Sequence, residues 1–348
     1  MSRFLRIALL LTLVAASAGC DRRAVDYSAL ENALPAHNAI QPIPALTAGQ
    51  GNYFDSQAFD PCIIPHPADP AKLLMMFTAM PAPTGNNSYE IARATASVSD
   101  PQTWEVSAGP VFHVGPPGAW DSVHLRCDSL VYADGTLYMF YDGCDSTYTQ
   151  IGLARSTDAG LTWIRDPHNP VIPTSGDEYW TSSAAVILDN GTWHAWYNHS
   201  TSCCVTGGEY LDGVRDASAP APEGPWSKTN VTLLSESPKF LEWHQVFKLG
   251  SDYVMVYETG SYSVDWTIGL ARASAAGAPF VKSVKNPILA GSGIAGRFDR
   301  YHVATPAFFR AGGRWYLMYT GASDFEQPFG YNHWSMGVTE ISGLTGQQ

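Results

Sequence analysis

Five short stretches of this sequence combine carboxylates, histidines and aromatic side chains. They lie at residues 55–61, 120–128, 177–183, 241–245 and 298–306. Carboxyl groups that meet in space can do acid–base chemistry, because a protonated one donates to a leaving oxygen while an ionised one activates water or attacks. We take Asp60, Asp128 and Glu242 as the candidates for these catalytic roles.

The same stretches hold side chains suited to a neutral, ring-shaped ligand. Aromatic rings stack on apolar faces, while histidines and carboxylates bond hydroxyl groups, and a sugar presents both kinds of surface. The candidate substrate-binding residues are Asp55, Asp121, His124, Trp180, Trp243, His244, Tyr301 and His302.

Some of these positions have a second interpretation. Asp55, Asp121 and Asp299 each follow an aromatic residue, and this recurrence favours a shared structural role in capping turns over catalysis. His124 and His302 follow Asp121 and Asp299 at equal spacing, so an axial metal site is an alternative. A histidine satisfied within the protein is commoner. We therefore assign no metal ligand and expect no required cofactor, with an axial calcium ion left open.

The elements that must position these residues repeat about every sixty residues. Apolar and aromatic runs recur at 73–77, 137–141, 193–197, 253–257 and 315–319. A third segment with related text follows each of them and reads Ile-Gly-Leu-Ala-Arg in two repeats, at 151–155 and 268–272. A fourth segment lies around Trp104, Trp163, Trp226 and Phe280. Four short strands per repeat form one propeller blade, so we predict an all-β, five-bladed β-propeller.

The fifth repeat stops after its third strand. Residues 40–46 are similar to segments that close other repeats, and we predict that they complete the last blade and close the ring. The domains expected are therefore a signal peptide at 1–20, a tether at 21–37 and the propeller at 38–348.

One turn carries a known structural motif. Residues 156–163 read Ser-Thr-Asp-Ala-Gly-Leu-Thr-Trp, the Asp-box pattern, in which Asp158 accepts backbone hydrogen bonds and Trp163 packs between strands. The motif occurs in several propeller families, so it supports the fold more than any activity.

These features together resemble the five-bladed glycoside hydrolases of families 43, 32, 62, 68, 117 and 130, over essentially the whole mature chain. Asp60-Pro61 resembles the site of the family 43 general base, and Asp128 resembles the aspartate that tunes the pKa of the acid. The resemblance implies hydrolysis of poly- or oligosaccharides, with water as the nucleophile and the acid and base roughly 6.5 to 9.5 Å apart.

The chain departs from the family pattern at the catalytic acid. Thr181, Ser182 and Ser183 stand on the third inner strand, where those families carry a glutamate. Glu242 is the provisional acid, although the count places it in the fourth blade, and Glu178 and His302 are the alternatives.

Two other functions compete with hydrolysis. A non-catalytic propeller that captures sugars or a partner protein is favoured by the missing third-blade glutamate. A sialidase-like enzyme is suggested by the Asp box, but it would need six blades and an arginine cluster. The arginines of the third strands repeat with the blades, which argues against such a cluster, and we rank this function last because the sequence contains five repeats. The sugar, the linkage, the anomeric outcome and exo or endo action stay open.

The N-terminus predicts export. Arg3 and Arg6 precede an apolar run at 7–16, too short to span a bilayer, and the text then resembles a bacterial lipobox ending at Cys20. We expect a monomeric protein of the bacterial cell envelope, at the periplasmic or outer surface, that contacts the membrane only through a lipid on Cys20. A formal net charge of −12 argues against nucleic acid as a partner.

Five cysteines remain after Cys20 in a compartment that permits disulfides. An odd number leaves at least one unpaired. Cys127 and Cys144 flank a predicted hairpin and could face each other, and Cys203 and Cys204 could form a vicinal bridge. None has the spacing of a zinc site.

Overall fold

The computed structural model describes residues 26–34, 41–42, 46–47, 53–54, 57–80, 88–201, 213–261, 264–323 and 334–345. Cys20, Asp55, Cys203 and Cys204 lie outside these ranges. Within them, no helix is both long and apolar enough to cross a bilayer.

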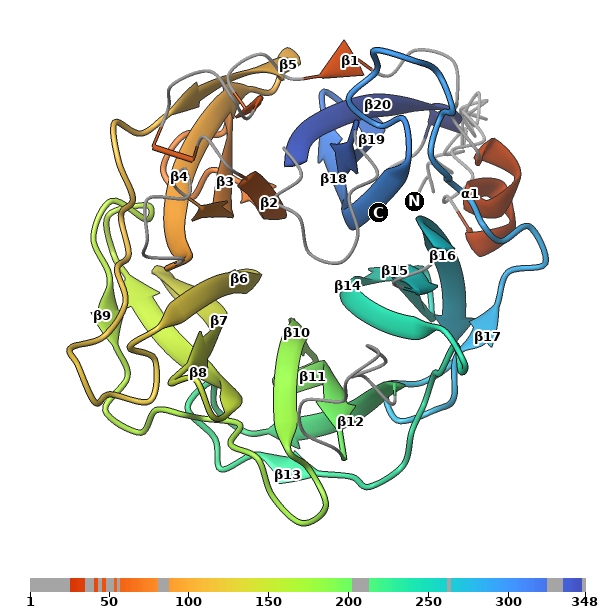
Figure 1. Ribbon diagram of the computed structural model, residues 1–348. Helices are drawn as coiled ribbons and strands as arrows, with labels where there is room; N and C mark the ends of the chain where they lie inside the picture. Colours follow the sequence, from red (N-terminus) through yellow and green to blue (C-terminus); the bar gives the residue numbers. More distant parts are fainter. Residues whose placement is uncertain are drawn as a thin grey trace, which may run out of the picture.

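The described chain is all-β apart from one short helix, and its antiparallel sheets are arranged in a ring (Figure 1). Three sheets have four strands each in chain order. The first contains β6 (His124–Ala133), β7 (Thr136–Cys144), β8 (Thr149–Ser156) and β9 (Ile164–Arg165). The second contains β10 (Trp180–Asp189), β11 (Thr192–Ser200), β12 (Gly213–Ala219) and β13 (Ser227–Lys228). The third contains β14 (Phe240–Leu249), β15 (Asp252–Ser261), β16 (Val264–Ala273) and β17 (Val281–Lys282).

The remaining eight strands form one larger sheet. One part contains β2 (Gln57–Pro65), β3 (Lys72–Met80), β4 (Glu90–Ser97) and β5 (Asp100–Val106). The other contains β18 (His302–Ala311), β19 (Arg314–Ala322), β20 (Trp334–Thr345) and β1 (Gln41–Pro42). A single parallel pair, Gln57 with Trp334, joins the two parts. The predicted N-terminal segment does add to the last repeat, because Gln41 and Pro42 pair with β20.

The predicted second strands are correct in position, because the five apolar runs lie within β3, β7, β11, β15 and β19. These strands are buried on both faces, which explains their nearly continuous apolar sequence. The apolar clusters lie between neighbouring sheets of the ring. One joins β3 and β4 to β18, β19 and β20, so the first and last strands of the chain also share a core.

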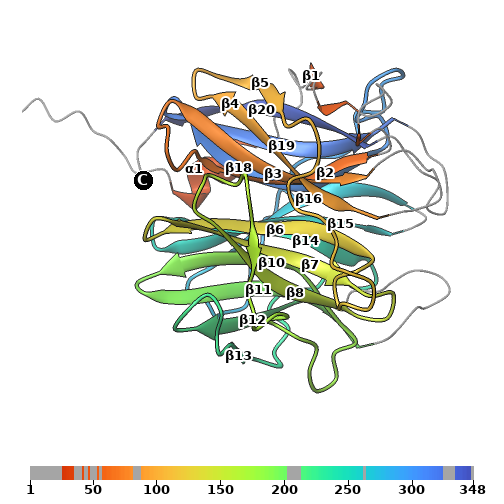
Figure 2. The same ribbon diagram turned by 90° about the vertical axis from the view of Figure 1, so that its left-hand side faces the viewer.

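Each inner strand, β2, β6, β10, β14 and β18, carries a β-bulge at a similar level. A bulge adds one residue to one strand of a pair and locally reorients the side chains beside it. Asp60, Ser183 and Thr305 sit at three of these bulges with φ near +50° (54°, 53° and 44°). The side view shows that the strands of neighbouring sheets cross the molecule in similar directions (Figure 2).

The prediction of a tether at 21–37 is wrong for residues 26–34, the part of it that the structure describes. Residues Tyr27–Ala33 form helix α1, which Asp26 caps by accepting a hydrogen bond from the Ala29 amide at 2.8 Å. Tyr27, Leu30 and Leu34 are buried in the core cluster that contains residues of β15, β16 and β19. This segment is therefore part of the folded body, because its apolar face is covered by the sheets.

The expected cross-hairpin cysteine pair is also corrected. Cys127 pairs in register with Tyr141, whereas Cys144 pairs with His124, so the two cysteines are not opposite each other. Cys62, Cys127 and Cys144 are buried free thiols.

Candidate active site

A pocket of about 190 Å³ opens where the inner strands of several sheets meet. Its aromatic wall comes from Phe59, Tyr89, Trp266 and Trp334, and its charged lining comes from Arg126, Glu242 and Glu258. Trp266 and Trp334 lie with ring centroids 5.3 Å apart. Aromatic rings beside hydrogen-bonding groups form the kind of surface that binds a sugar.

The side chains that face this pocket come from one equivalent position on the inner strands. Phe59, Arg126, Glu242 and Ala304 each pair with the residue of the second strand that directly follows its buried aromatic residue. Ser182 occupies this position in β10. Because side chains alternate along a strand, the residues at the bulges that follow point elsewhere.

Arg126 is the centre of the charged network. Its guanidinium bonds both oxygens of Asp60, with Nε to Oδ2 at 2.8 Å and Nη2 to Oδ1 at 3.0 Å. Its Nη1 donates to Oε1 of Glu242 at 2.7 Å. Two carboxylates that share one guanidinium have their nearest oxygens within about 8 Å, which is compatible with the separations used in glycoside hydrolysis.

Asp60 lies beneath Arg126 and is not exposed to the pocket. The residue is fully buried, and Oδ2 also accepts a hydrogen bond from the Thr78 hydroxyl at 2.9 Å. Burial raises the pKa of Asp60, and the Arg126 charge opposes that rise. Both carboxyl oxygens are occupied, so Asp60 cannot reach a water or a substrate while Arg126 stays in place. The assignment of Asp60 as the base is corrected for this arrangement.

Asp128 lies beside a second buried carboxyl, Asp142, rather than in the pocket. Burial and the Asp142 charge raise the pKa of Asp128 well above its usual range. Burial also raises the pKa of Asp142 to about 7, and its carboxyl accepts the Ser183 amide at 3.0 Å. Asp128 therefore has no direct contact with Glu242, the acid that it was expected to tune.

Polar residues of the second strands tie each sheet to the next. Asp142 holds the Ser183 amide, Thr78 accepts the Cys127 amide at 3.0 Å, and Asn198 donates to the Leu241 carbonyl at 2.7 Å. Glu258 completes this series by accepting the Thr305 amide through Oε2 at 2.6 Å. These four side chains, at equivalent positions, hold the bulged inner strands in register, which fixes the pocket wall.

A second recurring network explains several carboxylates outside the pocket. In each case a buried tyrosine of the second strand donates to a carboxylate in the loop before the inner strand. The pairs are Tyr141 with Asp121, Tyr197 with Glu178, Tyr257 with Glu236 and Tyr319 with Asp299. A cation bonds each carboxylate, namely Arg165, Lys228, Lys282 and Arg297. Asp121 and Asp299 are therefore bonded within the protein, each to a tyrosine and an arginine, and neither lines the pocket.

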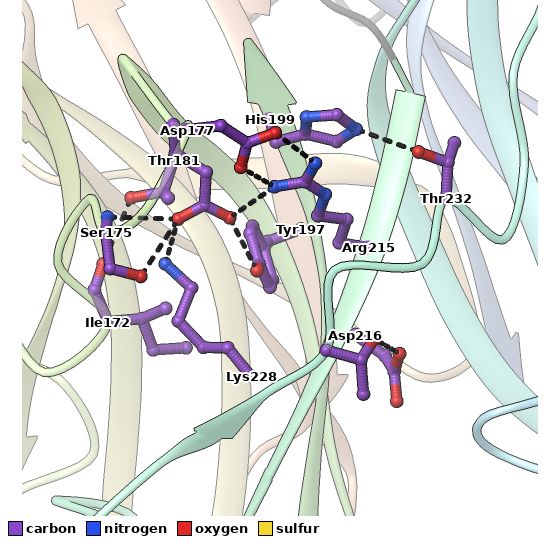
Figure 3. Close-up of polar contacts among 12 residues, drawn as sticks. Ile172, Ser175, Asp177, Thr181, Tyr197, His199, Arg215, Asp216, Lys228 and Thr232 are labelled. Atoms are coloured by element: carbon purple, nitrogen blue, oxygen red, sulfur yellow. Dashed lines mark hydrogen bonds and ion pairs between the residues drawn. The ribbon is translucent and has the colours of Figure 1, made fainter. Parts of the chain in front are cut away.

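Glu178 belongs to this network and cannot be the acid. Figure 3 shows Ser175, Tyr197, Arg215 and Lys228 converging on one carboxylate, which is that of Glu178. Its side chain is 1% exposed and both oxygens are bonded. A carboxylate held by two cations in the protein interior has no path to a substrate.

Two more predicted substrate ligands are buried. Trp243 is 2% exposed and packs in the core cluster between two sheets, so its ring cannot stack on a sugar. His244 is 1% exposed, and its Nε2 bonds the Trp196 carbonyl at 3.0 Å. Both corrections have one cause: only Glu242 in this stretch occupies the pocket-facing position, and the bulge directs the next residues into the core.

The other two predicted histidines, His124 and His302, lie beside the pocket wall. His124 is tilted against the Tyr89 ring, with centroids 5.5 Å apart, and burial followed by the Arg126 charge lowers its pKa to about 4. His302 is buried and stacks on Trp334, and its Nδ1 accepts the Trp266 amide at 3.2 Å. His302 thus positions the two pocket tryptophans and does not line the pocket itself.

Trp180 and Tyr301 do not line the pocket either. Trp180 is half-buried beside Tyr179, and Tyr301 is half-buried with the Arg300 guanidinium over its ring. Among the described residues, no group of three His, Cys, Asp or Glu side chains is arranged to hold a metal ion.

The residues that the sequence interpretation missed are Arg126, Glu258 and the pocket aromatics. Regular alternation would place Arg126 on the same face as Asp128, but the bulge between Cys127 and Ser129 separates them, so the sequence alone carries no signal that Arg126 faces the pocket. Glu258 lies on a second strand, where the sequence shows only another polar residue in an apolar run.

No protein-family model matches the sequence, and no curated protein matches it. Solved structures do match its fold. The complex of BT0996 with RGII aligns over 92% of this chain and 95% of its own, with 16% identity and a TM-score of 0.67. A thermostable family-43 glycoside hydrolase aligns over 84% and 94%, with 16% identity and a TM-score of 0.61. The α-L-arabinofuranosidase from Podospora anserina, solved with cellotriose, aligns over 88% and 98%, with 12% identity and a TM-score of 0.62.

The fold therefore defines this chain as a β-propeller of the type found in family 43 and related glycoside hydrolases. The likeness extends over most of each compared chain.

Proposed function

We propose that the protein hydrolyses glycosidic bonds of poly- or oligosaccharides in the axial pocket. The observation that carries the proposal is the pairing of Arg126 with Glu242 inside an aromatic-lined pocket, in a fold shared with glycoside hydrolases. Glycoside hydrolysis needs two carboxyl groups beside a sugar-binding surface. Glu242 has a side chain that is 28% exposed, so it can meet a substrate directly.

The roles of the predicted catalytic aspartates change in this proposal. Asp60 becomes a positioning residue, since it holds Arg126 by two hydrogen bonds and Arg126 in turn orients Glu242. Asp128 and Asp142 form a buried acid pair that supports the inner strand behind the pocket.

We infer that the ring has five blades. The support is that five inner strands carry equivalent bulges, and that the eight-stranded sheet is joined at its middle by one residue pair only. In this interpretation β2–β5 form the first blade, and β18–β20 with β1 form the last. We propose a propeller domain spanning 38–348, with the apolar face of α1 packed into one of its core clusters.

Export and lipid anchoring at Cys20 belong to the same proposal, and would place the enzyme at the bacterial envelope. The test is the distribution of the full-length protein between membrane and soluble fractions of the producing cell. Cys20→Ala should move an exported protein into the soluble fraction, and an unchanged distribution would exclude the lipid anchor.

Hydrolysis is tested with the full chain purified in detergent. The substrates are arabino- and xylo-oligosaccharides, RGII, and the matching aryl glycosides, chosen from the proteins of similar fold. Sugar release should fall by roughly 10²–10⁴-fold in Glu242→Gln. Glu223→Gln is the matched control, because Glu223 also pairs with an arginine at 2.8 Å but lies outside the pocket.

A capture protein is the second candidate function. It is favoured by the neutralisation of Asp60 by Arg126 and by Ser182 at the pocket-facing position of β10. Binding of these sugars without turnover, unchanged in Glu242→Gln, would replace the hydrolase with this function.

A further inference from the structure

Glu258 lies beside Glu242 on the neighbouring strand, and it differs from Glu242 in its burial and its hydrogen bonds. The two residues are paired in register across β14 and β15, and both line the pocket. Glu258 is 2% exposed as a residue. Its Oε2 accepts the Thr305 amide, while its Oε1 has no hydrogen-bond partner among the described residues.

The hydrogen bond that links two neighbouring sheets does not by itself explain why position 258 carries a glutamate. Thr78, Asp142 and Asn198 form the same tie elsewhere in the ring, and none of them lines the pocket. Both oxygens of the Asp142 carboxyl accept the Ser183 amide. Glu258 is one methylene longer than Asp142 and serves the tie with a single oxygen, which leaves the other for the pocket.

We propose that Glu258 is the general acid of the hydrolysis and that Glu242 is its ionised partner. This inference rests on the proposed function and replaces the assignment of Glu242 as the acid. Glu242 is held by Arg126 as an ion pair, which is the state that a base needs.

The surroundings of Glu258 favour its protonated form. Burial and the neighbouring Glu242 charge raise the pKa of Glu258 well above its usual range. The Thr305 amide and the Arg126 charge oppose the rise, and Asp60 adds to it. An acid kept neutral beside an ionised carboxylate is the arrangement by which other glycosidases protonate a leaving group near neutral pH.

The proposed reaction returns both glutamates to their starting protonation states. Glu258 gives its Oε1 proton to the glycosidic oxygen as the bond from that oxygen to the anomeric carbon breaks, so the leaving group departs as an alcohol. Water adds to the anomeric carbon and gives one proton to Glu242. That proton returns through water to Glu258, so the net reaction is the glycoside plus water giving two hydroxyl compounds.

The test compares leaving groups in Glu258→Gln, using the full chain. Glutamine retains an oxygen for the Thr305 amide but cannot act as an acid. We expect kcat on unactivated xylo- or arabino-oligosaccharides to fall by roughly 10²–10⁴-fold. On the 2,4-dinitrophenyl glycoside of the same sugar, whose phenolate leaves without a proton, the loss should be less than about tenfold.

The pH profile gives a second readout. The parent should lose kcat on the oligosaccharide as pH rises through the pKa of Glu258, and Glu258→Gln should lack this alkaline limb. The matched control is Asp142→Asn, which alters the equivalent tie in another sheet and should affect both substrates equally. If Glu258→Gln does not fold, Glu258→Asp, which withdraws the acid by one methylene, should show the same dependence on the leaving group.

Each outcome separates this inference from the proposed function. Equal losses on both substrates, with the alkaline limb retained, would show that Glu258 is structural and would overturn the inference while the hydrolase stands. A parent inactive on every substrate of the panel would overturn the proposed function itself, and the inference with it.

Discussion

Replacement of Arg126 by methionine should destabilise the protein strongly, because the arginine neutralises a carboxylate that no water can reach. Asp60 is fully buried and has three hydrogen bonds, of which Arg126 supplies two. Removing one partner of a buried ion pair typically costs about 3–5 kcal/mol, since the other charge stays buried. Glu242, at 28% exposure, can turn to solvent and adds little to this loss.

The loss should depend on pH in a defined direction. Without Arg126 the folded-state pKa of Asp60 rises further above its unfolded value, because burial is its largest perturbation. Stability is then present below the unfolded pKa and is lost as pH rises. Arg126→Met should therefore lose less free energy of unfolding at pH 5 than at pH 8.

Urea unfolding followed by tryptophan fluorescence measures both values. Asp60→Asn combined with Arg126→Met should recover most of the loss, because the buried charge is gone. Arg314→Met is the control, as its ion pair with Glu340 is on the surface and its removal should leave the unfolding midpoint unchanged. A loss below about 1 kcal/mol at pH 8, or no recovery in the double variant, would refute the reasoning.

Three further predictions concern other parts of the ring. Asp142→Asn should flatten the pH dependence of stability. The folded-state pKa of Asp142, about 7, makes the parent lose stability as pH rises from about 4 through about 7. Thermal unfolding at pH 5 and pH 8 measures this pH dependence in both proteins. Glu178→Ala should lower the free energy of unfolding by about 3–5 kcal/mol, because Lys228 and Arg215 lose a buried partner, and an unchanged urea midpoint would contradict this. Trp266→Ala should weaken binding of the sugars that the parent binds by roughly tenfold without altering the urea midpoint, as titration calorimetry would show.

The sequence by itself determined the repeating architecture. Each second strand is buried on both faces, so its apolar run is nearly continuous and recurs with every sheet. The sequence also indicated which stretches lie at the centre of the ring, because the inner strands converge wherever such sheets form a ring. Glu242, one of the residues selected in this way, lines the pocket, whereas Asp121 and Asp299 lie outside it.

Only the tertiary structure decided which side chains in those stretches face the pocket. Side chains alternate between the two faces of a strand, so a shift of one residue moves a side chain from the pocket into the core. The position of the bulge decides which residues face which side. Asp60, Asp128 and Trp243 lie at bulges and are buried, whereas Phe59, Arg126 and Glu242 face the axis. The contacts of Arg126 with Asp60 and Glu242 span 66 and 116 residues, so no local pattern could reveal them. Glu258 reaches the pocket from a second strand, because the bulge in front of it leaves room for its carboxyl.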